Sequence, residues 1–121
     1  MEGRIGYLIV GVRDLERAVN FYRDVLGFKL IFSEPKFHFA RFDVGGMSFS
    51  LAASDTDGHG GTPGDRHTGI GIAVDDVDAA YEELKAKGVV FTMAPAKQPW
   101  GGYMGLFADP DGNEFYLDSG T

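Results

Sequence analysis

The sequence predicts an α+β fold made of two tandem modules, each with the order strand, helix, strand, strand, strand. The prediction rests on two segments that each occur twice. Residues 12–19 (VRDLERAV), which lead to Gly27, recur as residues 74–81 (VDDVDAAY), which lead to Gly88. Residues 43–51 (DVGGMSFSL) recur as residues 109–117 (DPDGNEFYL). Two copies of this length are too few for a solenoid and indicate a pseudo-symmetric fold instead.

The first module, at about residues 5–53, is predicted to begin with a strand at about 5–12, which is rich in β-branched residues. Asp14 is the expected N-cap of a helix whose apolar residues recur at helical spacing. Gly27 supplies the C-terminal stop of this helix. Strands are then predicted at 28–33, 37–44 and 47–52, with Pro35 in the first turn.

The second module, at about residues 67–118, repeats this order after a linker at about 54–66. The linker is rich in Gly, Asp and Thr, and we expect it to be mobile. The predicted elements are a strand at 68–74, a helix at 76–87, a strand at 89–93, a loop through Pro95 and Pro99, and strands at 103–108 and 113–118. We expect residues 1–121 to form a single domain.

The composition of the chain excludes several classes of partner and of functional site. The formal net charge of −7 argues against nucleic acid and anionic membranes as partners, because both require basic surfaces. The chain has no cysteine, which excludes disulfides, thiolate metal sites and a cysteine nucleophile. No signal peptide and no run of membrane-spanning length is visible. We therefore expect a cytoplasmic protein.

Alternation along the strands separates a helix-facing row from an opposite face. A two-residue hairpin at Gly45 and Gly46 is expected to pair Arg41 with Ser50 and Asp43 with Ser48. The opposite face then combines glycines with polar side chains and large rings, namely Tyr7, Phe37, Phe39, Arg41, Ser48, Ser50, Gly69, Gly71 and Tyr116. Small residues beside large rings form either a packed layer or a concave pocket, and we favour the pocket.

Two motifs resemble a known family. Residues 14–18 (DLERA) and 21–28 (FYRDVLGF) resemble the first-helix signature of the vicinal oxygen chelate superfamily, which includes glyoxalase I, extradiol dioxygenases and bleomycin-resistance proteins. Residues 98–101 (QPWG) and 107–113 (FADPDGN) resemble its C-terminal signature. The resemblance covers nearly the whole chain. It implies two βαβββ modules that form a curved mixed sheet around a concave cleft, with helices on the outer face, usually in a homodimer.

Enzymes of this family hold a divalent metal with four side chains, usually His, Glu or Gln. The resemblance places these positions at Tyr7, Ser50, Gly69 and Tyr116, which do not form a usable ligand set. A two-residue shift in register brings His67 and Glu114 to the cleft, but leaves Ser48 and Ile5 as the other two positions. We therefore expect neither a metal ion nor another cofactor.

The favoured function is metal-free binding of a bulky aromatic or cationic natural product, as in family members that confer antibiotic resistance by sequestering a drug. Trp100 and Tyr103, in a Gly-rich loop, are candidates for stacking on a ligand ring, although Trp100 can equally be a packing residue. Arg41 is a candidate for polar recognition, or else forms a structural ion pair with Asp43 or Glu114. Glu114 and Asp118 would favour a cationic ligand.

An enzyme is the alternative, either a glyoxalase-like protein or an isomerase or lyase without the four-ligand metal site. Its acid–base candidates are His67, Glu114, Tyr7 and Tyr116. A scaffold domain with a filled concave face is a third alternative. The other histidines carry little functional signal, because His38 is expected on the helix-facing row and His59 in the linker.

Overall fold

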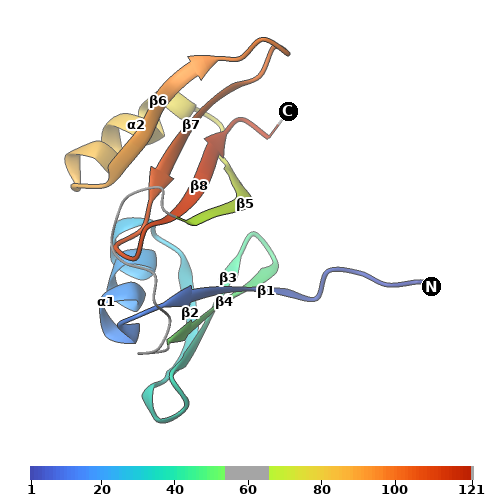
Figure 1. Cartoon of the computed structure of the whole chain (residues 1–121), viewed down its shortest axis with the longest axis vertical. Helices are drawn as coiled ribbons and strands as arrows, with labels where there is room; N and C mark the ends of the chain where they lie inside the picture. The colour runs from blue at the N-terminus through green and yellow to red at the C-terminus, as the bar shows by residue number, and fades with distance from the viewer. Residues whose placement is uncertain (54–65, 121) are drawn as a thin grey trace. The chain divides into compact units, whose positions relative to one another are not determined.

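The computed structural model describes residues 1–53 and 66–120 (Figure 1). It divides into two compact units, Met1–Gly58 and His59–Thr121, which we call module 1 and module 2. Each unit holds one four-stranded mixed sheet, which confirms the α+β fold with two tandem modules. Most of the expected linker, with His59, lies outside the described residues; Arg66, its last residue, begins a strand.

Module 1 has the expected order of elements, with short helical turns added after the first helix and the second strand. Its strands occur in the sheet in the order β1-β4-β3-β2, with β1 parallel to β4 and the other neighbours antiparallel. The elements are β1 (Tyr7–Val12), α1 (Leu15–Asn20), a π-helical turn (Phe21–Val25), β2 (Lys29–Glu34), a 3-10 turn (Pro35–Phe37), β3 (Phe39–Val44) and β4 (Met47–Ala53).

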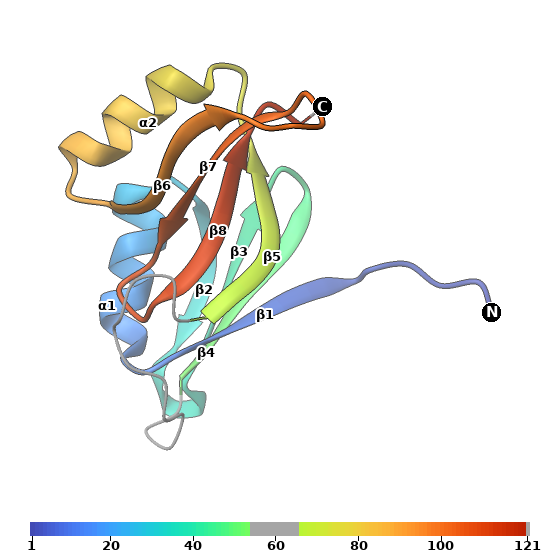
Figure 2. The same ribbon diagram turned by 45° about the horizontal axis from the view of Figure 1, so that its top comes forward.

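Module 2 repeats this topology, with the strand order β5-β8-β7-β6 and β5 parallel to β8. In each module the helix lies over one face of its own sheet and leaves the other face open (Figure 2). We call the uncovered face the open face. The elements are β5 (Arg66–Ala73), α2 (Val77–Ala86), β6 (Val90–Lys97), β7 (Tyr103–Ala108) and β8 (Asn113–Asp118).

Both helices begin at an aspartate, as the sequence predicts. Asp14 Oδ1 accepts a hydrogen bond from the backbone N–H of Arg17 at 3.0 Å. Asp76 Oδ1 accepts the equivalent bond from Ala79, also at 3.0 Å. Each cap satisfies a backbone donor that has no partner within the helix, and so fixes where the helix starts.

The core of each module lies between its helix and its sheet. In module 1 the fully buried ring of Tyr22 packs against Phe49 and Phe42, with centroid distances of 5.2 and 6.1 Å. In module 2 the buried rings of Phe107 and Phe115 stack at 5.5 Å. These rings fill the helix-facing rows, so the open faces are free to carry other side chains.

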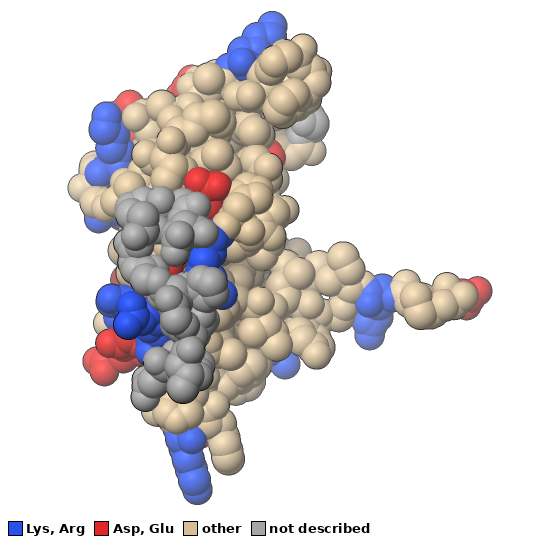
Figure 3. All heavy atoms as spheres, in the orientation of Figure 1, with Lys and Arg blue, Asp and Glu red and all other residues tan. Residues whose placement is uncertain are grey.

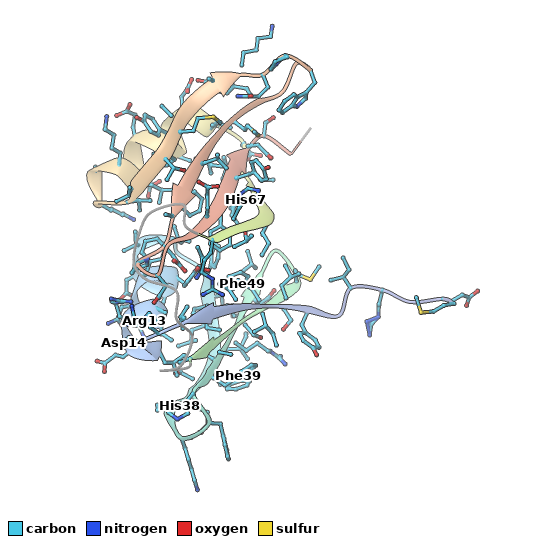
Figure 4. The ribbon with its side chains drawn as sticks, in the orientation of Figure 1. Arg13, Asp14, His38, Phe39, Phe49 and His67 are labelled. Atoms are coloured by element: carbon cyan, nitrogen blue, oxygen red, sulfur yellow. The ribbon has the colours of Figure 1, made fainter. Side chains whose placement is uncertain are left out.

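Two residues near the turn between β2 and β3 lie elsewhere than predicted. Phe37 ends the 3-10 turn, where its side chain is 72% exposed, so its placement in a strand was wrong. His38 has a left-handed backbone with φ of 55° and is exposed, so its placement on the helix-facing row was wrong too (Figure 4). Pro35, with its fixed φ, starts the helical turn and delays β3 until Phe39.

The predicted loop through Pro95 is also corrected, because β6 continues to Lys97. The pairing of β6 with β7 is irregular between Met93 and Ala96, next to this proline. Strand β6 is an edge strand, and a bulge on an edge strand accommodates a residue without a backbone N–H.

On the face shown in Figure 3 the Lys and Arg side chains lie in separate groups, with no continuous basic patch among the residues described. Among residues 1–53 and 66–120, no helix combines the length and the apolar character that crossing a bilayer requires.

Candidate functional site

The open face of module 1 contains a hollow of about 470 Å³. Its lining comes from four strands and the residue before β1, and it mixes rings, an aliphatic side chain, an arginine and two serines. The lining residues are Gly6, Tyr7, Ile9, Phe32, Phe39, Arg41, Ser48 and Ser50. Five of the nine predicted binding residues are therefore brought together here: Tyr7, Phe39, Arg41, Ser48 and Ser50.

The register of the strands explains this grouping. The hairpin at Gly45 and Gly46 pairs Arg41 with Ser50, as predicted from the sequence. On the other side of β4, Tyr7 pairs with Ser48 and Ile9 pairs with Ser50. The short serine side chains form the floor of the hollow, and the longer side chains on the neighbouring strands stand around it.

Phe32 was not predicted, and a β-bulge brings it to the hollow. Leu30 pairs with Phe42, but Phe32 then pairs with Arg41, so Ile31 is an extra residue in β2. A bulge of this kind turns the following side chain to the other face of the sheet. The ring of Phe32 therefore lies beside Phe39, with a centroid distance of 6.0 Å. Three consecutive apolar residues, which break the alternation, are the signal that could have revealed it.

Arg41 brings a positive charge to the hollow. Its Cζ lies 5.8 Å from the centroid of the Phe32 ring, a cation–π contact that holds the guanidinium over the aromatic wall. Asp43 instead accepts a hydrogen bond from the backbone N–H of Gly46 at 2.9 Å. Within the described residues no ion pair joins Arg41 to Asp43, so the guanidinium N–H donors can serve a ligand.

The other predicted binding residues lie outside this hollow. Phe37 is in the 3-10 turn. Trp100 is 71% exposed in the turn between β6 and β7, with its ring folded over Gly102, where an added Cβ would lie 2.8 Å from the indole nitrogen. Ligand contacts of both residues stay predictions.

Tyr103 points toward the helix of module 2. Its hydroxyl donates a hydrogen bond to Asp78 of α2, so the side chain lies on the helix side of the sheet rather than on the open face. This bond favours the neutral phenol and raises the pKa of Tyr103 above its ordinary value. The structure therefore gives Tyr103 a contact within its own module, and ligand binding by this residue also stays a prediction.

The open face of module 2 carries a chain of hydrogen bonds. His67 lies on β5 (Figure 4) and pairs with Glu114 of β8. Its Nδ1 is 2.8 Å from Glu114 Oε1, and its Nε2 is 3.1 Å from the hydroxyl of Tyr116. The three residues were predicted as acid–base candidates, but their mutual contact was not.

Two threonines hold Glu114 in place. The hydroxyl of Thr92 donates to Glu114 Oε2 at 2.6 Å, and the hydroxyl of Thr68 donates to the backbone carbonyl of Glu114 at 2.7 Å. The side chain of Glu114 is only 12% exposed, whereas that of His67 is 43% exposed. The carboxylate is thus fixed beneath an imidazole that solvent and small molecules can reach.

The residues present do not fit a four-ligand metal centre. Of the positions that correspond to the family's ligands, Gly69 has no side-chain donor and the hydroxyl of Tyr116 is hydrogen-bonded to His67. Tyr7 and Ser50 supply only neutral hydroxyls, which are poor ligands for these metals. In the part of the chain that the structure describes, no group of three or more His, Cys, Asp or Glu side chains is placed to hold a metal ion.

The family model and the similar solved structures all indicate the same superfamily. The model described as Glyoxalase/Bleomycin resistance protein/Dioxygenase superfamily matches residues 4–117. The crystal structure of a member of this superfamily from Sphaerobacter thermophilus DSM 20745 is 32% identical, covers 97% of both chains and has a TM-score of 0.80. TnmS3, an antibiotic-binding protein from Streptomyces sp. CB03234, is 32% identical, with a TM-score of 0.75, over 97% of this chain and 95% of its own.

An enzyme is among the relatives as well. The lactoylglutathione lyase GLX1 from Arabidopsis thaliana is 32% identical over 122 residues, which cover 94% of this chain but only 43% of the plant protein. This chain thus spans less than half the length of that relative. The relatives include both binders and enzymes, so they show the superfamily and not one activity. The matched model covers nearly the whole described chain, and the protein belongs to the glyoxalase/bleomycin resistance protein/dioxygenase (vicinal oxygen chelate) superfamily.

Proposed function

We propose that this protein binds a bulky, planar aromatic small molecule in the hollow of module 1, without a metal ion and without chemical conversion of the ligand. The observation that carries the proposal is the set of apolar side chains left exposed around this hollow. Tyr7 is 63% exposed, Ile9 52% and Phe32 42%. Apolar side chains gathered at one site favour a ligand that covers them.

The size and the lining of the hollow support this class of ligand. Its volume of about 470 Å³ lies within the range of small-molecule sites. The rings of Phe32 and Phe39 form one wall, on which a planar ring system can stack. Stacking and burial give affinity without the perturbed acids or bases that catalysis requires.

Polar recognition falls to Arg41 and the serines. The guanidinium can donate hydrogen bonds to a carbonyl, phenolate or carboxylate of the ligand, and Ser48 can donate or accept a further one. A positive charge beside the hollow disfavours a cationic ligand. The proposal is therefore an aromatic ligand with acceptor groups, in preference to the cationic class that the acidic composition suggested.

The relatives lend further support. TnmS3 is named as an antibiotic-binding protein, and the alignment with it covers nearly all of both chains. We therefore extend the proposal to sequestration of an aromatic natural product, which would protect the cell by lowering the free concentration of a drug. The symmetric homodimer expected from the sequence stays a prediction.

A binding titration tests the hollow with the fluorescent aromatic sulfonate 8-anilinonaphthalene-1-sulfonate. A thermal-shift panel follows with mitomycin and with bleomycin, whose positive charge should give it the smaller shift. Loss of an aromatic contact costs about 1.4 kcal/mol, so Phe39→Ala should weaken binding of the sulfonate about tenfold. Arg41→Gln should weaken it by a similar factor, because the sulfonate loses its cationic partner.

The matched control is Phe91→Ala, which removes a phenylalanine of module 2 that packs against Tyr81 and does not line the hollow. This variant should bind as tightly as the wild type, and a chelator should leave binding unchanged. Equal weakening by both phenylalanine substitutions would place the ligand elsewhere. Conversion of any bound compound into a product would contradict sequestration and favour the enzyme alternative.

A further inference from the structure

We propose that Tyr116, His67 and Glu114 form a nucleophilic triad on the open face of module 2, in which the Tyr116 hydroxyl accepts an acyl group from an activated carboxylic ester. This activity is separate from binding in the hollow of module 1 and does not depend on it. The three side chains come from only two adjacent strands, β5 and β8.

The hydrogen bonds fix the direction of proton transfer. An ionised carboxylate can only accept, so His67 Nδ1 carries the hydrogen that it donates to Glu114 Oε1 at 2.8 Å. In the neutral imidazole, Nε2 then has a free lone pair, and it accepts the hydrogen bond donated by the Tyr116 hydroxyl at 3.1 Å. A hydroxyl, a base and a carboxylate that orients the base, at these distances, are the recognised pattern of an activated nucleophile.

The carboxylate is held more firmly than a surface ion pair. Glu114 accepts from His67 with one oxygen and from Thr92 with the other, at 2.6 Å, and its side chain is 12% exposed. Thr68 also anchors the backbone of Glu114. This support holds the imidazole in one tautomer, which is the role of the carboxylate in a triad.

Space for an electrophile exists beside the triad. The β5–β8 pairing passes from His67 with Glu114 directly to Gly71 with Tyr116, so β5 bulges between these pairs. Gly69 lies in this bulge with φ of 74°, and an added Cβ there would meet no atom within 4 Å. Tyr116 itself is half-buried, and the space over Gly69 is the side from which we expect an ester to approach its hydroxyl.

Acyl transfer and hydrolysis take place in two steps. The Tyr116 oxygen bonds to the acyl carbon of the ester while its proton passes to His67 Nε2, and the ester oxygen leaves with the electron pair of the broken bond. The resulting imidazolium is stabilised by the Glu114 carboxylate. His67 gives this proton to the departing ester oxygen or to solvent, and its Nε2 is then free again. Water attacks the acyl carbon while its proton passes to His67 Nε2, and the Tyr116 oxygen leaves with the electron pair of the broken bond. That oxygen takes the proton back from His67, which releases the carboxylic acid and restores the hydroxyl of Tyr116.

The experiment uses p-nitrophenyl acetate as the probe. The wild-type protein should release p-nitrophenolate in a burst, and mass spectrometry of its peptides should locate an acetyl group on Tyr116. Since a general base contributes about 10²-fold or more, His67→Gln should slow this acetylation at least about 100-fold. Glu114→Gln should slow it less, because the base remains, and Tyr116→Phe should abolish labelling at this position.

The matched control is Tyr81→Phe, a tyrosine of α2 that packs against Phe91 on the helix side of the same module. This variant should keep the full rate of acetylation at Tyr116. Binding of the aromatic sulfonate should be unchanged in His67→Gln, so failure of the triad and failure of the hollow give different results. Equal acetylation of Tyr116 in wild type and His67→Gln, or none in either, overturns the proposal.

A second measurement keeps the test independent of the folding of the variants. Nitrogen-15 NMR of the wild-type protein distinguishes which ring nitrogen of His67 carries the hydrogen at neutral pH. The triad requires the hydrogen on Nδ1 and a free lone pair on Nε2. A hydrogen on Nε2 instead would overturn it, because the imidazole could not then take the proton of Tyr116.

Discussion

The two modules build the same sheet and place different chemistry on it. In module 1 the second residue of β4, Ser48, pairs with Tyr7 of the parallel strand β1. In module 2 the second residue of β8, Glu114, pairs with His67 of the parallel strand β5. The same place in the topology therefore holds a hydroxyl beside a phenol in one module and a carboxylate beside an imidazole in the other.

This difference shows that each module uses the helix-facing side of its sheet for the core, whereas the open face carries the candidate functional residues. The helix-facing rows of both modules are apolar and aromatic, because both must exclude water from a core under one helix. The open faces are not needed for that core, so their side chains differ between the modules. Module 1 gathers exposed rings around Arg41, and module 2 gathers hydrogen-bonding groups around His67.

The largest expected effect tests whether the two cores are equivalent. Phe42→Ala in module 1 and Phe107→Ala in module 2 each remove a ring that is at most 1% exposed. Each should lower the free energy of unfolding by about 3–5 kcal/mol, since a buried phenylalanine leaves a cavity when truncated. Urea denaturation followed by circular dichroism measures both.

The comparison on the open face is Phe32→Ala, which removes a ring that is 42% exposed. It should cost much less than either core substitution, because less area returns to water and no closed cavity forms. A cost as large as that of Phe42→Ala would mean that the ring wall of module 1 serves the fold, and the contrast between core and open face would fail.

A smaller effect is expected at the two N-caps. Asp14→Ala and Asp76→Ala each remove a side chain that accepts a backbone hydrogen bond at 3.0 Å, one in each module. Each should lower the free energy of unfolding by about 1 kcal/mol. Because the two caps have the same geometry, clearly unequal losses in urea denaturation would show that one module limits the stability of the chain and the other does not.

Regular elements could be predicted from the sequence, and irregular ones could not. The hairpin register was correct because Gly45 and Gly46 adopt positive φ values of 60° and 89°, which only a few residue types tolerate and which fix a two-residue turn. The cap at Asp14 was correct for a similar reason, since an aspartate before an apolar helical pattern has one strong local role. Asp76 was predicted only as the first residue of its helix, and the structure shows that it is the cap.

The candidate sites depend on bulges, where strict alternation fails. The extra residue Ile31 turns Phe32 into the hollow, and the bulge around Gly69 accompanies the contact of His67 with Glu114 and Tyr116. A bulge depends on the pairing of two strands, so one strand alone shows at most a break in alternation, as at residues 30–32, and not which residue is the extra one. Phe37 was misplaced because the 3-10 turn begun by Pro35 is as compatible with the local sequence as a strand.

The smallest expected effect is a pH dependence that belongs to module 2. The hydrogen bond from the Tyr103 hydroxyl to Asp78 raises the pKa of Tyr103 above 10.0 in the folded state. The bond therefore stabilises the folded protein fully below that pH, and the stabilisation is lost as the pH rises through the raised pKa. Thermal unfolding of wild type and Tyr103→Phe should differ at about pH 8, and the difference should shrink as the pH rises above the ordinary pKa of tyrosine. Other tyrosines titrate in both proteins and cancel in the difference, so a gap that stays constant across this range would mean that Tyr103 stabilises the end of β7 by packing alone.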